Sequence, residues 1–392
     1  MKAKSLDVII LGAGVSGLWL ANQLSNLGYN FIVVDNSAIG GVQTLASQGM
    51  IHGGQKYALT GSLSEHSYRS LNMTKRWQSA LNGTGEIDLS KTKLLSENQY
   101  MWSAGGLADY AAVFAAAKIV NSATKKLKPS DYPSALKNLS GLVYELPEQV
   151  LEVKSLLKNL VDPIASRVFK GNVNSIKEDG SITIDNELFQ AKAVIATAGL
   201  GNENIIKMLG YDKVFTQRRP LKQLAVKTMQ HPLFGHGITT NPKPRVTITS
   251  HPCDDGGYIW YLGGNVAETG TNLSDIEAIK YAEQEMQAIF PKIVWDEKEW
   301  SVIKVDRAEP FVASGQLPPG AHVQEFGNIL VGWPTKLTFA PDLADKVCDI
   351  LARKNILASD SIGEDIGLLN LEFGDYPWQK ISWFKSKDFG DL

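Results

Sequence analysis

The chain has 392 residues, of which 44% are hydrophobic and 20% are charged, and its formal net charge is −2. Such a composition is typical of a globular protein with a large core, and the near-neutral charge argues against general attraction to nucleic acid. The two cysteines favour a reducing compartment over a disulfide framework. No apolar run approaches the roughly 18 residues of a membrane span. We therefore expect a cytoplasmic protein, and peripheral contact with the inner face of a membrane stays open.

The N-terminal segment is predicted to alternate a strand, a helix and a second strand. Residues 7–11 form an apolar run, and residues 16–27 carry apolar side chains at helical spacing. Gly28 is the expected end of that helix. A second apolar run follows at 31–34 and ends in Asp35. This order of elements is that of a βαβ unit with two parallel strands.

The turn between the first strand and the helix carries a glycine fingerprint. Gly12, Gly14 and Gly17 form a G-x-G-x-x-G set. Gly12 permits the tight turn, Gly14 lets the backbone approach a pyrophosphate, and Gly17 lets helix and strand pack closely. Asp35 can accept hydrogen bonds from the hydroxyls of a ribose. The motif predicts dinucleotide binding, without separating FAD from NAD, and Val15, Ser16 and Asn36 are expected beside the ligand.

The central part of the chain contains further elements, which we take in order. The pattern predicts a helix at 65–81, a strand at 99–102, a helix at 106–120, a polar surface connection at 122–139, and a helix at 146–161 with Pro147 in its first turn. Next come a hairpin at 175–189 with its turn at 178–181 and a buried strand at 191–199.

The region from 221 to 264 is rich in β-branched and aromatic residues with frequent turns, which is typical of an antiparallel sheet. We expect two of Tyr258, Trp260 and Tyr261 to pack inside and one to line a substrate pocket. A helix at 273–290, a strand at 328–331 and a helix at 340–352 with Pro341 in its first turn follow. The aromatic stretch from 368 onward is expected to wrap around the body of the protein, with a partner surface as the alternative.

These elements predict an α/β fold, in which a Rossmann-like nucleotide-binding domain contains an inserted, mostly antiparallel α+β domain. The expected boundaries are 1–75, 145–215 and 305–355 for the nucleotide-binding domain, 76–144 and 216–304 for the substrate domain, and 356–392 for the tail. An active site is expected at their junction.

Three further stretches accompany the fingerprint. They are Ser-Gln-Gly-Met-Ile-His-Gly-Gly-Gln-Lys-Tyr-Ala-Leu at 47–59, Ala-Thr-Ala-Gly at 196–199, and the pair Arg-Ala-Glu-Pro at 307–310 and Gly-Trp-Pro-Thr-Lys-Leu-Thr at 332–338. Together they resemble the flavin oxidoreductases related to D-amino-acid oxidase and FAD-dependent glycerol-3-phosphate dehydrogenase. Lys56 stands where the glycerol-phosphate enzymes usually have Arg, Trp333-Pro334 stands where they have Gly-Gly, and their large C-terminal domain is missing here.

The resemblance implies FAD as the cofactor, since no second fingerprint is present for another dinucleotide. It places further residues beside FAD, namely Ser47, Gly49, His52, Ala198, Gly199, Gly332, Lys336, Leu337 and Thr338. Backbone N–H groups of a helix that begins near Thr338 would face the flavin C2 carbonyl, and Thr338 is also the expected N-cap of that helix.

Four residues are candidates for the chemistry. His52 is suited to accept the substrate proton, since its imidazole titrates near neutrality. A covalent bond from His52 to the flavin and a purely loop-shaping role are the alternatives. Lys56, Arg307 and Lys336 would hold a phosphate or carboxylate. No metal site is predicted.

The leading hypothesis is an FAD-dependent oxidoreductase that takes a hydride from a small anionic alcohol of the glycerol-3-phosphate or 2-hydroxy-acid type. An amino-acid or amine oxidase on the same fold and a non-catalytic flavin-binding partner protein are the alternatives. The sequence leaves the electron acceptor open.

Overall fold

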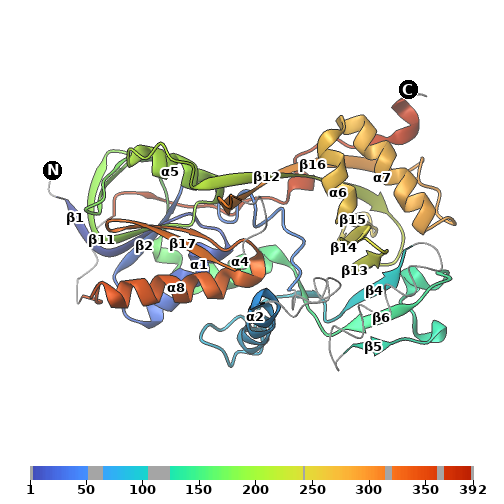
Figure 1. Ribbon diagram of the computed structural model, residues 1–392, viewed down its shortest axis with the longest axis horizontal. Helices are drawn as coiled ribbons and strands as arrows, with labels where there is room; N and C mark the ends of the chain where they lie inside the picture. Colours follow the sequence, from blue (N-terminus) through green and yellow to red (C-terminus); the bar gives the residue numbers. More distant parts are fainter. Residues whose placement is uncertain are drawn as a thin grey trace.

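The protein is built on two large sheets that lie in the two halves of the molecule (Figure 1). The computed structural model describes residues 3–51, 65–104, 124–241, 243–313, 320–359 and 366–389. Within these residues each of the two sheets has nine strands, and a separate pair joins β3 (Leu94–Ser96) to β7 (Val150–Leu151). This arrangement confirms the predicted fold class.

The first sheet has a parallel centre. Its order is β17 (His322–Phe326), β18 (Ile329–Trp333), β11 (Glu187–Ala196), β1 (Lys4–Leu11), β2 (Phe31–Asp35), β8 (Val168–Lys170) and β19 (Leu369–Asn370). The five strands from β18 to β8 run parallel. The hairpin of β9 (Val173–Ile176) and β10 (Ser181–Ile184) extends β11.

Both faces of this sheet are buried, which explains why its strands are continuous apolar runs. Val8 and Ile10 point to one face, where α1 (Val15–Asn26), α4 (Val153–Val161) and α8 (Ala340–Arg353) cover them. Ile9 and Leu11 point to the other face, beside α5 (Asn202–Met208) and the β9–β10 hairpin.

The second sheet is antiparallel except where β13 and β4 meet. Its order is β20 (Phe384–Lys385), β16 (Glu299–Pro310), β12 (Thr216–Thr228), β15 (Tyr258–Gly263), β14 (Val246–Pro252), β13 (Gly235–Ile238), β4 (Gln99–Ser103), β6 (Val143–Leu146) and β5 (Lys125–Lys126). On one face lie α6 (Asn265–Thr269) and α7 (Asp275–Ile289). Ser274 and Glu277 form a capping box at the start of α7.

A long antiparallel ribbon connects the two halves. Strands β12 and β16 pair continuously from Thr216 opposite Pro310 to Val226 opposite Trp300. In Figure 1 this ribbon runs from the first sheet into the second. Side chains of alternate residues on both strands therefore point together toward the junction of the two halves.

The predicted helix at 146–161 is wrong in its first half. Leu146 ends β6, and Val150 and Leu151 pair in β7, so α4 begins only at Val153. The carboxylate of Glu152 accepts a hydrogen bond of 2.6 Å from the Ser155 amide and caps the helix there. A short strand that is buried on both sides is apolar at nearly every position. Such a run also has apolar residues at helical spacing, so the pattern cannot distinguish it from a helix.

The hairpin at 175–189 is confirmed only for its first turn. A second turn at Asp185, which has a φ of +40°, ends β10 and starts β11, so Phe189 belongs to a third strand. The strand expected to reach residue 199 ends at Ala196, and a 3-10 turn, η5 (Gly199–Gly201), follows. The helix expected at 106–120 lies outside the described residues, whereas α2 (Glu65–Leu81) is confirmed.

The C-terminal segment packs against both halves. β19 pairs with β8, Phe373 bridges to Ile39, and β20 pairs with the edge of β16. Trp378 is buried with its ring 5.1 Å from that of Tyr261. The described part of this segment thus wraps the body as expected. Among the helices in the described ranges, none has the length and hydropathy needed to cross a membrane.

Candidate functional site

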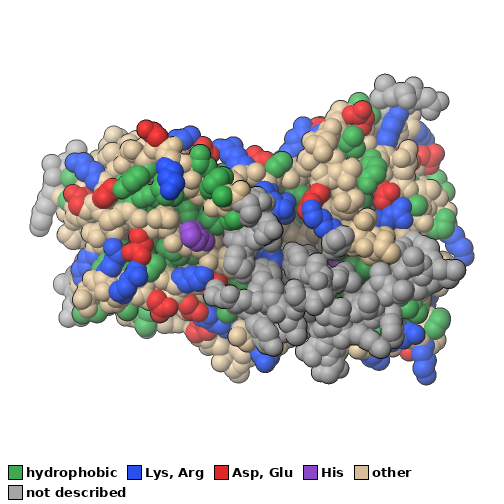
Figure 2. All heavy atoms as spheres, viewed as in Figure 1, with side chains coloured by type: hydrophobic (Ala, Val, Ile, Leu, Met, Phe, Trp, Pro, Cys, Tyr) green, Lys and Arg blue, Asp and Glu red, His purple; other side chains and the backbone are tan. Residues whose placement is uncertain are grey.

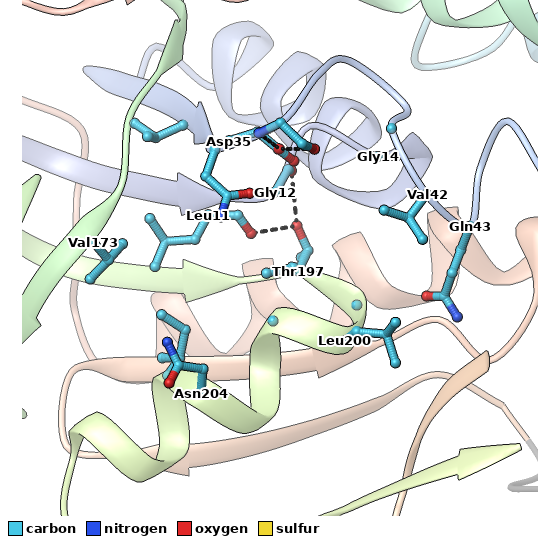
Figure 3. A pocket seen from close by; sticks show the side chains of 18 of the residues that line it. Leu11, Gly12, Gly14, Asp35, Val42, Gln43, Val173, Thr197, Leu200 and Asn204 are labelled. Atoms are coloured by element: carbon cyan, nitrogen blue, oxygen red, sulfur yellow. Dashed lines mark hydrogen bonds between the residues drawn. The ribbon is translucent and has the colours of Figure 1, made fainter. Parts of the chain in front are cut away.

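A cavity of about 430 Å³ opens at the carboxyl ends of β1, β2 and β11 (Figure 3). Ligands of parallel α/β sheets bind at this edge. The glycine turn, the end of β2 and the chain after β11 line it, and Figure 3 shows Thr197 beside Gly12 with Asn204 of α5 on the wall below.

The glycine turn is held tightly against the start of the segment after β11. The Gly12 amide donates to the Val34 carbonyl at 2.7 Å, and Gly12 has a φ of +108°. A Cβ at Gly12 would lie 2.6 Å from the Thr197 carbonyl oxygen, and one at Gly17 would lie 2.0 Å from the Gly12 carbonyl oxygen. Gly17 therefore serves the close helix–strand packing that the fingerprint predicts.

Asp35 organises the turn through its carboxylate. Oδ2 accepts the Ala13 amide at 2.9 Å, while Oδ1 accepts the amide and hydroxyl of Ser37 at 2.8 and 2.9 Å. Each carboxylate oxygen can accept more than one hydrogen bond. Asp35 can thus fix the glycine turn and still receive hydroxyl groups of a ligand in the cavity it lines.

A second cavity, of about 570 Å³, lies between the two sheets. It shares Gly14, Gln43, Thr44, Thr197 and Gly199 with the first cavity, so the two form one continuous space that extends from the glycine turn to the β12–β16 ribbon. In Figure 2 the molecular surface is hollowed between the two halves, and Lys and Arg side chains lie beside this hollow. Together the two cavities suit a long, charged ligand.

The predicted site residues converge on this space. Gly12, Asp35, Asn36 and Ala198 line the first cavity, Gly14 and Gly199 line both, and Val15, Ser16, Ser47, Gly49, Gly332, Lys336, Leu337, Thr338 and Arg307 line the second. Gly17 lines neither cavity and instead lies in the packing contact between α1 and the glycine turn. His52 and Lys56 lie outside the described residues.

Two serine hydroxyls in the larger cavity have no hydrogen-bond partner among the described residues. Ser16 Oγ, at the N-terminus of α1, and Ser47 Oγ are buried without a hydrogen bond to any described residue. Buried polar atoms are nearly always satisfied, and unsatisfied ones call for a ligand or water. The pair fits the polar chain of a dinucleotide that starts at the helix N-terminus.

Several charged residues of the larger cavity escaped sequence reasoning. Arg219 lies directly opposite Arg307 in the β12–β16 ribbon, and Glu309 follows Arg307 on the same face. Lys243 and Glu268 form an ion pair with each other at the wall. Because side chains alternate along a strand, the sequence could have placed Glu309 on the same face as Arg307. No local sequence pattern indicates Arg219, which lies on the neighbouring strand.

The segment at Lys336–Thr338 forms a 3-10 turn, η7 (Leu337–Phe339), that leads into α8. The prediction of Thr338 as the N-cap is wrong, because Phe339 occupies that position of α8. The Thr338 carbonyl instead accepts a hydrogen bond of 3.0 Å from Nε1 of the fully buried Trp77 in α2. The 3-10 turn before α8 places its N-cap one residue later than Thr338.

The aromatic strand residues lie behind the cavity. Trp260 and Tyr261 are fully buried on opposite faces of the second sheet, which confirms that two of the trio pack inside, but none of Tyr258, Trp260 and Tyr261 lines the larger cavity. Burial raises the pKa of Tyr261 far above its ordinary value. Its hydroxyl therefore keeps its proton beside the Ala46 carbonyl, at 2.9 Å, and the Gln223 amide, at 2.6 Å, and Gln223 lines the cavity.

Metal binding has no evident place in the described residues, which contain no group of three or more His, Cys, Asp or Glu side chains that could hold an ion.

Comparisons with known proteins agree with this geometry. The family model described as FAD dependent oxidoreductase (DAO) matches residues 7–326. A probable FAD-dependent oxidoreductase of Pseudomonas aeruginosa is 39% identical over 367 residues, which cover 92% of this chain and 94% of that protein. The crystal structure of an FAD dependent oxidoreductase from the same organism covers 97% of this chain and 99% of its own, with a TM-score of 0.84 at 34% identity.

More distant structures share the fold. Glycine oxidase from Geobacillus kaustophilus has a TM-score of 0.64 at 15% identity and covers 92% of this chain and all of its own. The L-α-glycerophosphate oxidase of Mycoplasma pneumoniae, solved with FAD bound, has a TM-score of 0.62 at 14% identity and covers 95% and 99%. The chain therefore belongs to the FAD-dependent oxidoreductase family of D-amino-acid oxidase type, and FAD is its cofactor.

Proposed function

We propose that the protein oxidises a small anionic alcohol, of the glycerol-3-phosphate or 2-hydroxy-acid type, in the larger cavity. The observation that carries this proposal is the meeting of Arg307, Arg219 and Lys336 around one cavity that continues to the glycine turn. Guanidinium and ammonium groups at one site are suited to a phosphate or carboxylate.

The described residues that line the two cavities fit FAD along the combined length of both. We propose that a nucleotide-binding domain with the boundaries 1–75, 145–215 and 305–355 holds the cofactor, with its adenosine at Asp35 and its pyrophosphate at Gly12, Gly14 and Ser16. A substrate domain with the boundaries 76–144 and 216–304 then faces the substrate, and 356–392 is the tail. Bound FAD supplies the hydride acceptor. The orphaned hydroxyls of Ser16 and Ser47 support this placement.

The protein's own groups would bind and orient the substrate. Arg219 and Arg307 are register partners on the ribbon, so their side chains emerge on the same face of the sheet. Lys336 reaches the cavity from the segment after β18. An anion held between the ribbon and this segment would have its neighbouring carbon fixed in one orientation, which is the requirement for hydride transfer.

Anaerobic reduction of the bound flavin by a substrate panel tests the proposal. Each anionic compound is paired with its neutral analogue: glycerol 3-phosphate with glycerol, and D- or L-lactate with lactamide. We expect at least one anion to bleach the flavin and its neutral partner to do so far more slowly. Equal reduction by both members would exclude an anion-binding site. No reduction by any compound would favour a flavin-binding protein without turnover.

Replacing Arg307 by Met should raise the half-saturation concentration of the anion and leave the flavin content intact. A charge-assisted hydrogen bond contributes about 1.5–3 kcal/mol, so the expected rise is roughly 10- to 150-fold. Lys304→Met is the matched control, because Lys304 is exposed on the same strand and pairs with Asp275. A shift of the same size in both variants would show that Arg307 does not bind the anion. Lys336→Met is expected to affect both substrate and flavin.

Replacing Asp35 by Ala should weaken FAD binding by about 1–3 kcal/mol, or roughly 5- to 150-fold. The variant loses the acceptor for the ribose and also the acceptor of the Ala13 amide, which positions the glycine turn. Fluorescence titration of the apoprotein with FAD measures the change. Wild-type affinity in the variant would show that the adenosine lies elsewhere in the cavity.

An amino acid or amine is the second candidate substrate. Glycine oxidase is among the structures that share this fold. In addition to its Lys and Arg side chains, the larger cavity is lined by two carboxylates, Glu268 and Glu309. The panel therefore includes glycine, D- and L-alanine and L-proline, each compared with the hydroxy acid or the amide of similar size.

A further inference from the structure

His251 is a titratable residue that is buried outside the two cavities. It lies on β14, is only 3% exposed, and its Nε2 has no hydrogen-bond partner among the described residues. Aromatic rings surround the imidazole instead, with centroids 4.4 Å away at Trp378, 5.6 Å at Tyr376 and 6.3 Å at Tyr261. A neutral imidazole fits such a cage, whereas a charged one would lose its hydration without gaining a counter-charge.

The ionisable groups that pack against this ring are two phenols, Tyr261 of β15 and Tyr376 of the C-terminal segment. Burial raises the pKa of both far above the ordinary value, and the hydrogen bond from Tyr376 to Glu152 adds to the rise, so neither phenol becomes an anion. Burial also raises the pKa of the thiol of Cys253, which follows β14.

Further charged side chains around the cage do not compensate a charge on His251. They are exposed or paired with an opposite charge, namely Asp254, Asp255, the Lys227–Glu299 pair and the Lys154–Asp375 pair. Burial alone therefore lowers the pKa of His251, to about 3. The imidazole can gain a proton near neutral pH only when the cage opens to water.

The C-terminal segment forms the movable side of this cage. Tyr376 precedes the 3-10 turn η8 (Pro377–Gln379), Trp378 lies within it, and their rings stack at 4.6 Å with an interplanar angle of 10°. Farther along, β20 pairs with the edge of β16, and the Ser301 hydroxyl donates to the Ser382 carbonyl at 2.6 Å. We call residues 376–385 the C-terminal strap. Its departure would remove two of the three rings around His251.

The C-terminal strap also supports the wall of the larger cavity. Trp378 belongs to one apolar cluster with Tyr261 and Ala46, and its ring lies 5.1 Å from that of Tyr261. The Tyr261 hydroxyl lies 2.9 Å from the Ala46 carbonyl oxygen and 2.6 Å from the Gln223 amide oxygen. Both Ala46 and Gln223 line the larger cavity. Tyr261 therefore links the strap to two residues of the cavity wall.

We propose that the C-terminal strap is a pH-sensitive device: protonation of His251 releases residues 376–385 and loosens the wall of the larger cavity at Ala46 and Gln223. The docked strap holds the ring neutral, whereas in the released state the ring regains its ordinary pKa of about 6.5. Acid therefore favours release. Docking is strongest above about pH 6.5 and weakens about tenfold per pH unit below it, down to about pH 3.

Hydrogen–deuterium exchange of the FAD-loaded protein at pH 7.5 and pH 5.0 tests the release. Protection of peptides from the strap, corrected for the exchange rates of unstructured peptides at each pH, measures the opening equilibrium. We expect this protection to fall about 30-fold in the wild type between the two pH values. His251→Phe and His251→Gln cannot gain the proton, so their protection should change by less than about twofold.

Two control variants should keep the wild-type response to acid. Asp375→Asn removes the carboxylate that pairs with Lys154 and Lys380, so it shows whether protonation of this ion-pair partner causes the release. His231→Ala removes a histidine at an exposed position. His251→Phe should also raise the melting temperature, because it fills the cage without an unpaired nitrogen.

Dilution of the FAD-loaded protein, with released FAD followed by its fluorescence, measures the coupling to the cavity. This part of the inference rests on the proposed position of FAD beside Ser47, the residue after Ala46. Trp378→Ala removes a ring of the cage and should weaken FAD binding at pH 7.5 by about 2- to 30-fold, the range of coupling through packed side chains. The wild type should show a similar loss at pH 5.0, and His251→Phe should not.

The outcomes separate this inference from the proposed function. Strap protection that does not change with pH in the wild type, or that falls equally in both His251 variants, overturns the release. Release by acid with unchanged FAD affinity overturns the coupling to the cavity. The proposed oxidation of an anionic alcohol is decided by the substrate panel at pH 7.5, where the strap is docked, and fails or stands there independently of these results.

Discussion

Replacing Gly14 by Val yields a folded but colourless protein. Gly14 caps α1 with a φ of −80° and a ψ of 176°, a conformation that any residue adopts. A Cβ there would lie 3.1 Å from Thr44 Oγ1 and nothing else lies within 4 Å, so a small shift accommodates it. Gly14 lines both cavities, however, and a branched side chain would fill the passage between them. We expect FAD affinity to fall by more than about 100-fold, equivalent to about 3 kcal/mol.

The ratio of flavin to protein absorbance and the circular dichroism spectrum measure this result. Gly28→Ala is the control, because a Cβ at Gly28 meets no atom within 4 Å and the residue lies outside both cavities. Its φ of +79° makes the substitution cost about 1 kcal/mol of stability, without loss of colour. Gly17→Val should instead prevent folding, since its Cβ would meet the Gly12 carbonyl oxygen at 2.0 Å. A yellow Gly14→Val protein would exclude the proposed pyrophosphate position.

Replacing His52 by Ala should slow flavin reduction by about two to four orders of magnitude, the usual effect of removing a general base. His52 lies outside the described residues, but the chain leading to it is fixed at the larger cavity. Gly49 and Met50 line that cavity, and the Ile51 amide donates to the Gln149 carbonyl at 3.0 Å. A general base must be available in its neutral form, and imidazole supplies that form near pH 7.

Rapid mixing of substrate with the oxidised protein measures the rate, and acid precipitation shows whether the flavin is covalently attached. Loss of an acid-stable flavin in the variant alone would identify His52 as the tether. His231→Ala, at an exposed position, is the control. Normal reduction in His52→Ala, with no covalent flavin in the wild type, would leave only a loop-shaping role for His52.

The sequence by itself determined the βαβ unit and its turn. The apolar run of β1, the glycines and the acidic end of β2 lie within 35 residues, and each acts through local rules of backbone conformation and packing. The convergence of Gly12, Asp35 and Gly199 on one cavity could also be anticipated, because the carboxyl ends of parallel strands meet at one edge of a sheet.

Predictions from the local sequence pattern were wrong where contacts between residues far apart in the chain determined the structure. The stretch from Leu146 to Val161 matches a helical period, yet Leu146 ends β6, Val150 and Leu151 form β7, and α4 begins only at Val153. The pattern misled because buried strands and buried helices share the same apolar composition. Thr338 has the chemistry of a helix cap, but its carbonyl bonds to Trp77, which lies 261 residues earlier in the chain.

The sequence pointed to Arg307 and Lys336, but the tertiary structure alone decided which other charges accompany them in the larger cavity. Arg219 and Arg307 are 88 residues apart, and only the register of β12 against β16 places them opposite each other. A shift of that register by one residue would turn Arg219 away from the cavity, since side chains alternate between the two faces. The same register buries Glu309 beside Gln217, whose amide donates to Oε2. The sequence thus determined that a dinucleotide binds, while long-range strand pairing determined which charges of the β12–β16 ribbon line the larger cavity.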